Sequence, residues 1–269
     1  MPNYLCVTCG TQYPASDEPP AHCPICEDER QYVNPNGQQW TTLEALRPDH
    51  HLVIEPVEPH LYHLKPEPKV GIGQYAHLVQ TPHGNILWDC VPYIDDAAID
   101  AINALGGISA IAISHPHFHT TMVEWSRAFH NAPIYIHEGN RVDVVQPDTA
   151  IHYWDGATVS PLEGIMLIHC GGHFLGSAVL HWQDGAEGRG VILTSDTIYI
   201  VADPRYATFM YSYPNDIPLP VSKVRRIMAA IEPFAFDRAY AGFGAVMNTD
   251  AKAKINASAE RYIRILTEA

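Results

Sequence analysis

Short stretches of apolar residues, separated by turn residues, recur along the chain after residue 74. Residues 75–80 and 86–89 are two such stretches, and the turn between them, 81–85, contains proline and glycine. This pattern predicts a β-hairpin. Apolar runs bounded by turn residues predict further strands at 108–113, 134–137, 165–169, 178–182 and 191–194.

Apolar residues recur at helical spacing in stretches between and after these strands. Asp95 or Asp96 can cap the first helix, which carries Ile99, Ile102 and Leu105 on one face. The same spacing predicts helices over 122–129, near 141, over 221–231 and over 255–266. Because strands and helices mix in this order, without a glycine-rich phosphate loop after the first strand, we predict a layered α/β domain.

The chain before residue 75 has a different pattern. Residues 1–33 are poor in aliphatic side chains and rich in cysteine and proline, so this segment needs a bound metal to fold. A capping box at 41–44 predicts a short helix in a linker over 34–51. The proline-rich run 55–68 predicts an irregular or edge segment, with His60 and His63 on the surface. We therefore predict a metal module (1–33), the linker (34–51) and a main domain (52–269).

Composition narrows the classes of partner. The 30 acidic and 16 basic residues give a net charge of −14, which repels phosphate backbones and anionic lipid surfaces. We expect a small-molecule substrate and neither nucleic acid nor a membrane as partner. The start of the chain does not read as a signal peptide, and no apolar stretch is long enough to span a bilayer. The prediction is a soluble cytoplasmic protein.

Four of the six cysteines form two Cys-x-x-Cys pairs, Cys6 with Cys9 and Cys23 with Cys26. Two such knuckles can complete a tetrahedral four-sulfur metal site. A reducing compartment and the lack of a βαβ context count against disulfides and against a thioredoxin-like redox pair. The segment resembles rubredoxin, in which two such knuckles hold one iron, although Glu27 stands where rubredoxin usually has glycine. We expect zinc here, with iron as the alternative.

A histidine-rich segment follows the strand predicted at 108–113. Alternate residues of an extended segment point to one side, so His115 and His117 can share a metal, and His119 faces the same way if the extension continues. Two histidines alone also fit a structural hydrogen-bonded pair. Two further candidates lie in loops that leave predicted strands: His173, which follows Gly-Gly, and Asp196.

At these residues the chain resembles the metallo-β-lactamase-fold superfamily, whose motifs are His-x-His-x-Asp-His, a glycine-flanked His and an Asp that ends a strand. The resemblance covers residues 52–269. It implies a four-layer αββα sandwich with the metal site at one edge of the two sheets. It also implies that Asp89 is a supporting residue and that the metal ligands are His115, His117, His173 and Asp196.

The chain departs from this pattern at the positions that bind a second metal in the family. His119-Thr120 replaces the Asp-His pair, and Phe243 stands where the last metal histidine is expected. The resemblance therefore implies one catalytic metal, zinc or else iron. We predict a metal-dependent hydrolase in which zinc activates water for attack on an ester, thioester or lactone, and His119 or Asp196 handles the proton.

Two other functions remain open. His115, His173 and Asp196 form a two-histidine, one-carboxylate set that suits ferrous iron, and persulfide dioxygenases of the same superfamily use the equivalent set. The missing ligands also fit a non-catalytic relative, whose N-terminal module would dock a protein partner or a second copy of the chain. Seven residues could line a substrate pocket or belong to the core: Trp125, Phe174, Phe209, Met210, Tyr211, Tyr213 and Phe243.

Overall fold

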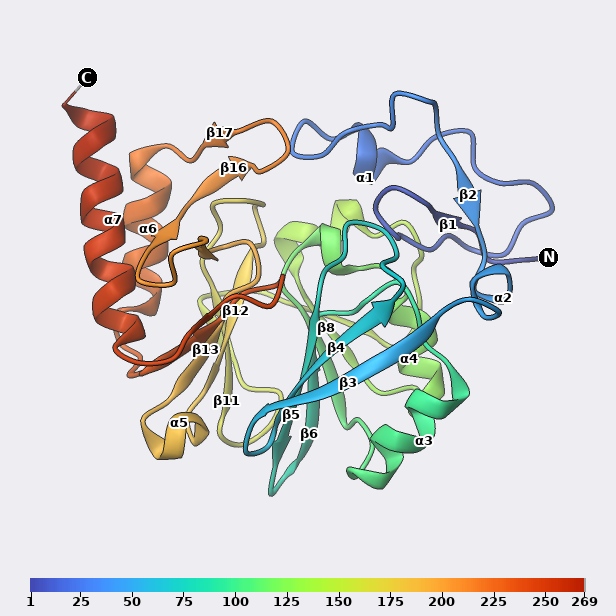
Figure 1. The fold of residues 1–269 in the computed structure, drawn as a ribbon, viewed down its shortest axis with the longest axis horizontal. Coiled ribbons are helices and arrows are strands. Elements are labelled where there is room, and N and C mark those ends of the chain that lie inside the picture. The colour runs from blue at the N-terminus through green and yellow to red at the C-terminus, as the bar shows by residue number, and fades with distance from the viewer. Residues whose placement is uncertain (269) are drawn as a thin grey trace. The chain divides into compact units, whose positions relative to one another are not determined.

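A computed structural model describes residues 1–268, which divide into two compact units. The first unit holds residues 1–136 and 141–153, and the second holds residues 137–140 and those from 154 onward. Each unit has its own hydrophobic core. Figure 1 labels the elements along the chain.

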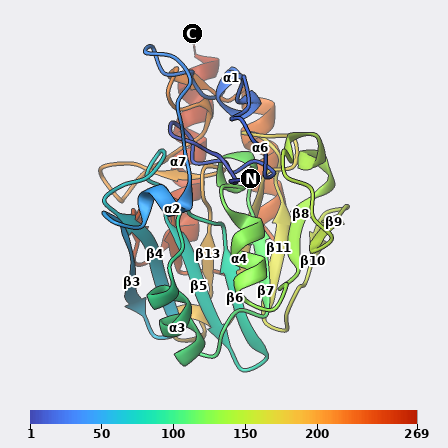
Figure 2. The same cartoon turned by 90° about the vertical axis from the view of Figure 1, so that its right-hand side faces the viewer.

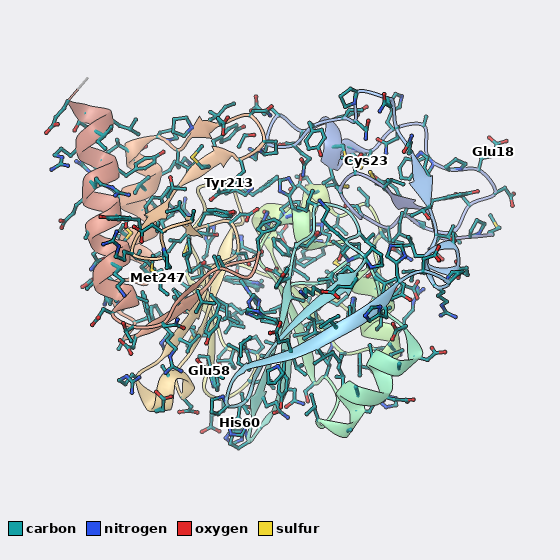
Figure 3. All side chains as sticks on the ribbon, viewed as in Figure 1. Glu18, Cys23, Glu58, His60, Tyr213 and Met247 are labelled. Atoms are coloured by element: carbon teal, nitrogen blue, oxygen red, sulfur yellow. The ribbon has the colours of Figure 1, made fainter. Side chains whose placement is uncertain are left out.

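The first unit begins with a small cysteine-rich module. Strands β1 (Leu5–Cys6) and β2 (Trp40–Thr41) pair antiparallel, and α1 is one helical turn over Pro24–Glu27. The buried interior of the module consists of its four cysteines with Tyr13 and Ile25. So few apolar side chains cannot by themselves offset the entropy lost when the segment is ordered. The predicted four-cysteine module is confirmed, and Cys23 is labelled beside α1 in Figure 3.

The main part of the first unit is a seven-stranded sheet in the order β3-β4-β5-β6-β7-β8-β9. Neighbours pair antiparallel from β3 to β6, and β6, β7 and β8 pair parallel. The strands are β3 (His51–Glu58), β4 (Leu61–Glu67), β5 (Ala76–Thr81), β6 (Gly84–Trp88), β7 (Ala110–Ile113), β8 (Ile134–His137) and β9 (Ile151–Trp154).

Three α-helices accompany this sheet: α2 (Leu43–Leu46), α3 (Asp96–Ala104) and α4 (Met122–Ala128). Figure 2 shows α3 and α4 over one face of the sheet. The carboxylate of Asp95 caps α3, because Oδ1 accepts from the Ala98 N–H at 2.7 Å. Its Oδ2 accepts from the Leu52 N–H at 3.0 Å, which ties the start of α3 to β3. Ile102 and Trp125 from these helices are fully buried in the core.

The second unit is built on a six-stranded sheet in the order β10-β11-β12-β13-β18-β19. All neighbours are antiparallel except β13 and β18, which are parallel. The connection between those two parallel strands carries two small hairpins and a helix. The strands of the sheet are β10 (Thr158–Val159), β11 (Ile165–His169), β12 (Ala178–Trp182), β13 (Val191–Leu193), β18 (Arg238–Tyr240) and β19 (Val246–Met247).

Two long helices pack beside each other in the second unit, α6 (Val221–Ile231) and α7 (Ala251–Thr267), as Figure 1 shows. Each has one apolar face, and α6 buries Val224, Ile227 and Ile231. The two hairpins before α6 are β14 (Tyr199–Ile200) with β15 (Ala207–Thr208), and β16 (Met210–Ser212) with β17 (Ile217–Pro218). The short α5 (Gly185–Gly188) lies between β12 and β13.

The proline-rich run over 55–68 agrees with its prediction in one part and differs in the other. Residues 55–58 form the second half of β3, which is an edge strand of the sheet, whereas Leu61–Glu67 forms β4, which pairs with β3 on one side and β5 on the other. Pro66 is tolerated because β5 pairs only with Leu61–Leu64 and does not need the missing N–H. His63, predicted on the surface, is 5% exposed, whereas His60 is exposed as predicted.

Candidate metal centres

The four cysteine sulfurs of the first unit lie within 4.8 Å of one another. Sγ of Cys6 is 3.5 Å from Sγ of Cys26, and Sγ of Cys9 is 3.6 Å from Sγ of Cys23. Four thiolates bound to one tetrahedral zinc at about 2.3 Å stand about 3.8 Å apart, so the observed spacing fits a single tetrahedral ion.

The four thiols strongly shift one another's pKa. Contacts with Cys23 and Cys26 lower the pKa of the Cys6 thiol, and contacts with the same two cysteines raise the pKa of Cys9. The cluster therefore loses its first proton easily and its later protons with difficulty, unless a cation compensates the charge. Gln38 adds stabilisation, because its Nε2 donates to Sγ of Cys6 at 3.0 Å.

His115 follows β7 at a turn that two buried polar side chains hold. Oδ1 of Asp89 accepts from the backbone N–H of Ser114 at 2.7 Å, and Asp89 itself has a left-handed backbone (φ 65°). The hydroxyl of Ser114 lies 2.9 Å from Nδ1 of His115. This contact engages Nδ1, so a metal would be bound through Nε2, the usual arrangement for a metal-binding histidine. Both Ser114 and His115 are fully buried.

The backbone that places His117 beside His115 has a different conformation from the predicted one. Residues Pro116–Phe118 form a 3-10 turn and not an extended segment, because Pro116 has the fixed φ that starts a helical turn. The two imidazole rings nevertheless lie 5.2 Å apart between centroids. Nε2 of Gln74 donates to the carbonyl oxygen of His117 at 3.2 Å, which holds the turn in place.

His119 ends this turn in a helical conformation and is 2% exposed. It does not belong to the group of side chains that the described residues offer to a metal. Burial, and the nearby His115, lower the pKa of its imidazole to about 3. His119 is therefore neutral at physiological pH.

In the second unit, His173 lies between β11 and β12, and Asp196 follows β13. The Nδ1 atom of His173 lies 3.1 Å from the carbonyl oxygen of Met210 and donates to it, so Nε2 is the nitrogen directed to a metal. Nε2 is 4.0 Å from Oδ2 of Asp196, and both side chains are buried. Gly172 permits this loop, because its φ is +91° and a Cβ there would lie 2.9 Å from Ile227.

Aromatic residues surround His173 and Asp196. Tyr213 (Figure 3) donates from its hydroxyl to the main-chain oxygen of Asp196 at 3.0 Å, and its ring centroid is 5.6 Å from that of His173. The ring centroid of Tyr199 is 4.8 Å from that of Tyr213 and 6.3 Å from that of Phe243. Trp125 and Phe209, considered as pocket residues from the sequence, are instead fully buried in the two cores. Tyr199 was not predicted, because nothing in its local sequence marks it.

A further histidine pair, His137 and His169, does not belong to the groups of side chains that the described residues offer to a metal. The rings of His137 and His169 stack at 3.6 Å between centroids, and Trp154 meets His137 edge-on at 4.6 Å. Nε2 of His169 lies 2.9 Å from the carbonyl oxygen of Leu175. These contacts give His169 a packed, hydrogen-bonded position.

The described residues offer two groups that could hold a metal ion: the four cysteines, and His115 and His117 with His173 and Asp196. The Cys-x-x-Cys spacing predicted the first group, and the metallo-β-lactamase resemblance implied the second. The second group combines three imidazoles and one carboxylate, a donor set that zinc and iron accept.

The chain has the fold of the metallo-β-lactamases, the αββα sandwich predicted from its sequence. Solved structures of three of these enzymes align with it: DIM-1 (TM-score 0.58, 11% identity, 79% of this chain and 98% of that one), SMB-1 (0.51, 17%, 82% and 97%) and one from Cronobacter sakazakii (0.52, 17%, 80% and 97%). At these identities the likeness establishes the fold alone.

The protein YmaE of Bacillus subtilis (strain 168), which is described as uncharacterized, is 51% identical over 268 residues, covering 99% of this chain and 97% of that protein. The chain belongs to the family of YmaE. No family model matches it. Within the described residues, every helix is too short or too polar to cross a membrane.

Proposed function

We propose that the protein is a metal-dependent hydrolase that binds one catalytic zinc ion through His115, His117, His173 and Asp196. Its substrate would be a small ester, thioester or lactone. The observation that supports this most is how two of the imidazoles are held: Nδ1 of His115 meets the Ser114 hydroxyl, and Nδ1 of His173 meets the Met210 carbonyl. Both rings are thereby oriented to bind a metal through Nε2.

When bound, zinc lowers the pKa of a coordinated water to about 7 and so provides a nucleophile at neutral pH. The chain supplies the orientation and the proton transfer. Asp196 carries the one carboxylate of the group, and we propose that its second oxygen accepts the proton from the attacking water. His119 is neutral and buried, so it would act as a hydrogen-bonding neighbour or a transient proton acceptor.

We infer the class of substrate from the missing ligands for a second metal and from the aromatic residues near Asp196. With His119-Thr120 and Phe243 at the positions expected to bind a second metal, only one ion would stabilise the developing charge. Esters, thioesters and lactones need less stabilisation than amides do. Tyr199, Tyr213 and Phe243 offer apolar contact to such a substrate.

We propose a structural zinc ion in the four-cysteine site, where the sulfur spacing fits tetrahedral coordination. All six cysteines are free thiols, which suits a reducing compartment, and we propose a cytoplasmic location on that ground.

The first test is metal content of protein purified without chelators or added metal, together with hydrolysis of a panel of aryl esters, acyl thioesters and lactones. His173→Ala should lose one metal per chain and all turnover, whereas His152→Ala, a substitution at an exposed position, should lose neither. Turnover that survives in His173→Ala contradicts a metal mechanism. Iron in place of zinc, with oxygen-dependent turnover, would favour an oxidoreductase, and absence of metal at these residues would favour a non-catalytic binding protein.

A further inference from the structure

The cysteine module contacts the histidine loop of the first unit directly. The backbone N–H of Gln12 donates to the carbonyl oxygen of Thr120 at 3.0 Å, and both residues are 2% exposed. Gln12 follows closely after the knuckle cysteine Cys9, and Thr120 follows closely after His117. One buried main-chain hydrogen bond thus joins a cysteine knuckle to the segment that carries the metal-site histidines.

A second connection runs through the segment before β5. A Cβ on Gly71 would lie 3.1 Å from the backbone of Cys9 and Gly10, so the two backbones are packed tightly against each other. From the same segment, Gln74 donates to the carbonyl oxygen of His117. Residues 71–74 therefore contact the knuckle at one end and the histidine turn at the other.

A third connection involves Val145 and Asp143. Val145 packs against the buried cysteine cluster. The main chain of Asp143 lies beside the imidazole of His119. The module's Asp28 and Arg30, themselves paired at 2.7 Å, act electrostatically on the Asp143 carboxylate. The module is thus joined to the histidine turn at several points, all within the first unit.

We infer that metal binding at the four cysteines sets the conformation of residues 117–120 and so controls the affinity of the histidine site for its metal. Gln12 is a positioning residue in this coupling. The inference rests on the proposed function, because it concerns regulation of the same site.

The physical reason is the small interior of the module. Its buried apolar cluster consists of the four cysteines with Tyr13 and Ile25, so without a metal the thiolates repel one another and the knuckle loses its cross-link. Thr120, which has a left-handed backbone (φ 33°), then loses the N–H that holds its carbonyl. A turn that samples more conformations must be ordered again when His117 binds a metal, and this cost lowers the affinity.

A cobalt(II) titration of the metal-free, full-length protein under reducing conditions tests the inference without any variant. Cobalt bound by four thiolates absorbs intensely through sulfur-to-metal charge transfer, whereas cobalt bound by imidazole and carboxylate gives only weak visible bands. We expect the thiolate signal to saturate before the histidine signal or together with it. A histidine site that fills at full affinity while the thiolate site is empty overturns the inference.

Two variants of one residue isolate the main-chain hydrogen bond. Gln12→Pro removes the N–H donor, and Gln12→Ala keeps it. We expect the cobalt affinity of the histidine site to fall about fivefold to tenfold in Gln12→Pro, the effect of one buried hydrogen bond, and to change less than about twofold in Gln12→Ala. Hydrogen exchange of the peptide 115–121 should increase in Gln12→Pro and not in Gln12→Ala.

Cys23→Ala, which cannot complete the thiolate site, should weaken cobalt binding at the histidine site at least as much as Gln12→Pro does. Equal affinities in the wild type and all three variants contradict the coupling but leave the proposed function intact. A wild-type protein that gives the thiolate signal and no histidine signal refutes the proposed function, and the inference with it.

Discussion

Nε2 of His173 faces Oδ2 of Asp196 at 4.0 Å inside the second unit, while Nδ1 of the same ring donates to the carbonyl oxygen of Met210. Two candidate ligands from separate loops are therefore oriented toward each other. Preorganised ligands bind a metal more tightly, because less side-chain freedom is lost on binding.

Replacing the carboxylate tests this pair. Asp196→Asn keeps the size of the side chain but removes its charge, so the affinity of the histidine site for zinc should fall at least ~10- to 100-fold. Competition with a zinc-binding dye measures this affinity. Asp155→Asn, at an exposed position of the same unit, is the control and should bind zinc like the wild type. Equal affinity in both variants would remove Asp196 from the ligand set.

Ser114→Ala tests the hydroxyl contact to Nδ1 of His115. Loss of a hydrogen bond that orients a ligand costs about tenfold in metal affinity, and turnover on any accepted ester should fall in parallel. Ser160→Ala removes an exposed hydroxyl that bonds a main-chain oxygen and should change neither quantity. If the two variants bind zinc equally well, Ser114 does not orient the imidazole.

The cysteine site has its own prediction. Cys26→Ala should reduce the metal content by one ion per chain and expose the first 40 residues to proteases, because the cysteines make up most of the buried apolar cluster of the module. Cys90→Ala changes a buried cysteine outside the cluster and should keep the full metal content. Elemental analysis and limited proteolysis read out both effects, and an unchanged metal count in Cys26→Ala would exclude a four-cysteine site.

Stability should fall with acid because of two histidines on β4 and β5. Burial lowers the pKa of His63 to about 4 and lowers that of His77 well below its usual range. Between pH 6.5 and 4 the unfolded chain binds more protons than the folded one, so the free energy of unfolding decreases as the pH falls through this window. The shifted pKa of His63 lowers the free energy of unfolding by about 3 kcal/mol across this window.

Urea unfolding at pH 7 and pH 5 measures this dependence. His63→Gln should lose part of the acid sensitivity, since glutamine does not titrate, whereas His60→Gln, at an exposed position, should keep the wild-type slope. The same pH slope in all three proteins would show that His63 titrates equally in the folded and unfolded states.

The sequence alone determined the identity of the candidate ligands and most of the secondary structure. Each Cys-x-x-Cys pair needs only local chain geometry to bring its two sulfurs together. Apolar runs bounded by turn residues mark strands, and an apolar period of 3.6 marks helices, without reference to distant residues. The hairpin of β5 and β6 and the helices α3, α6 and α7 could be predicted for this reason.

Only the tertiary structure decided how those ligands are held. The bond from Gln74 that holds the turn at Pro116–Phe118, the burial of His63 inside the sheet, and the bond from Gln12 to Thr120 depend on residues far apart in the chain. Local periodicity carries no information about such contacts, because their energies arise only when packing brings the partners together. The donor types could therefore be read from single motifs, while their orientation, and the link between the cysteine module and the histidine turn, could not.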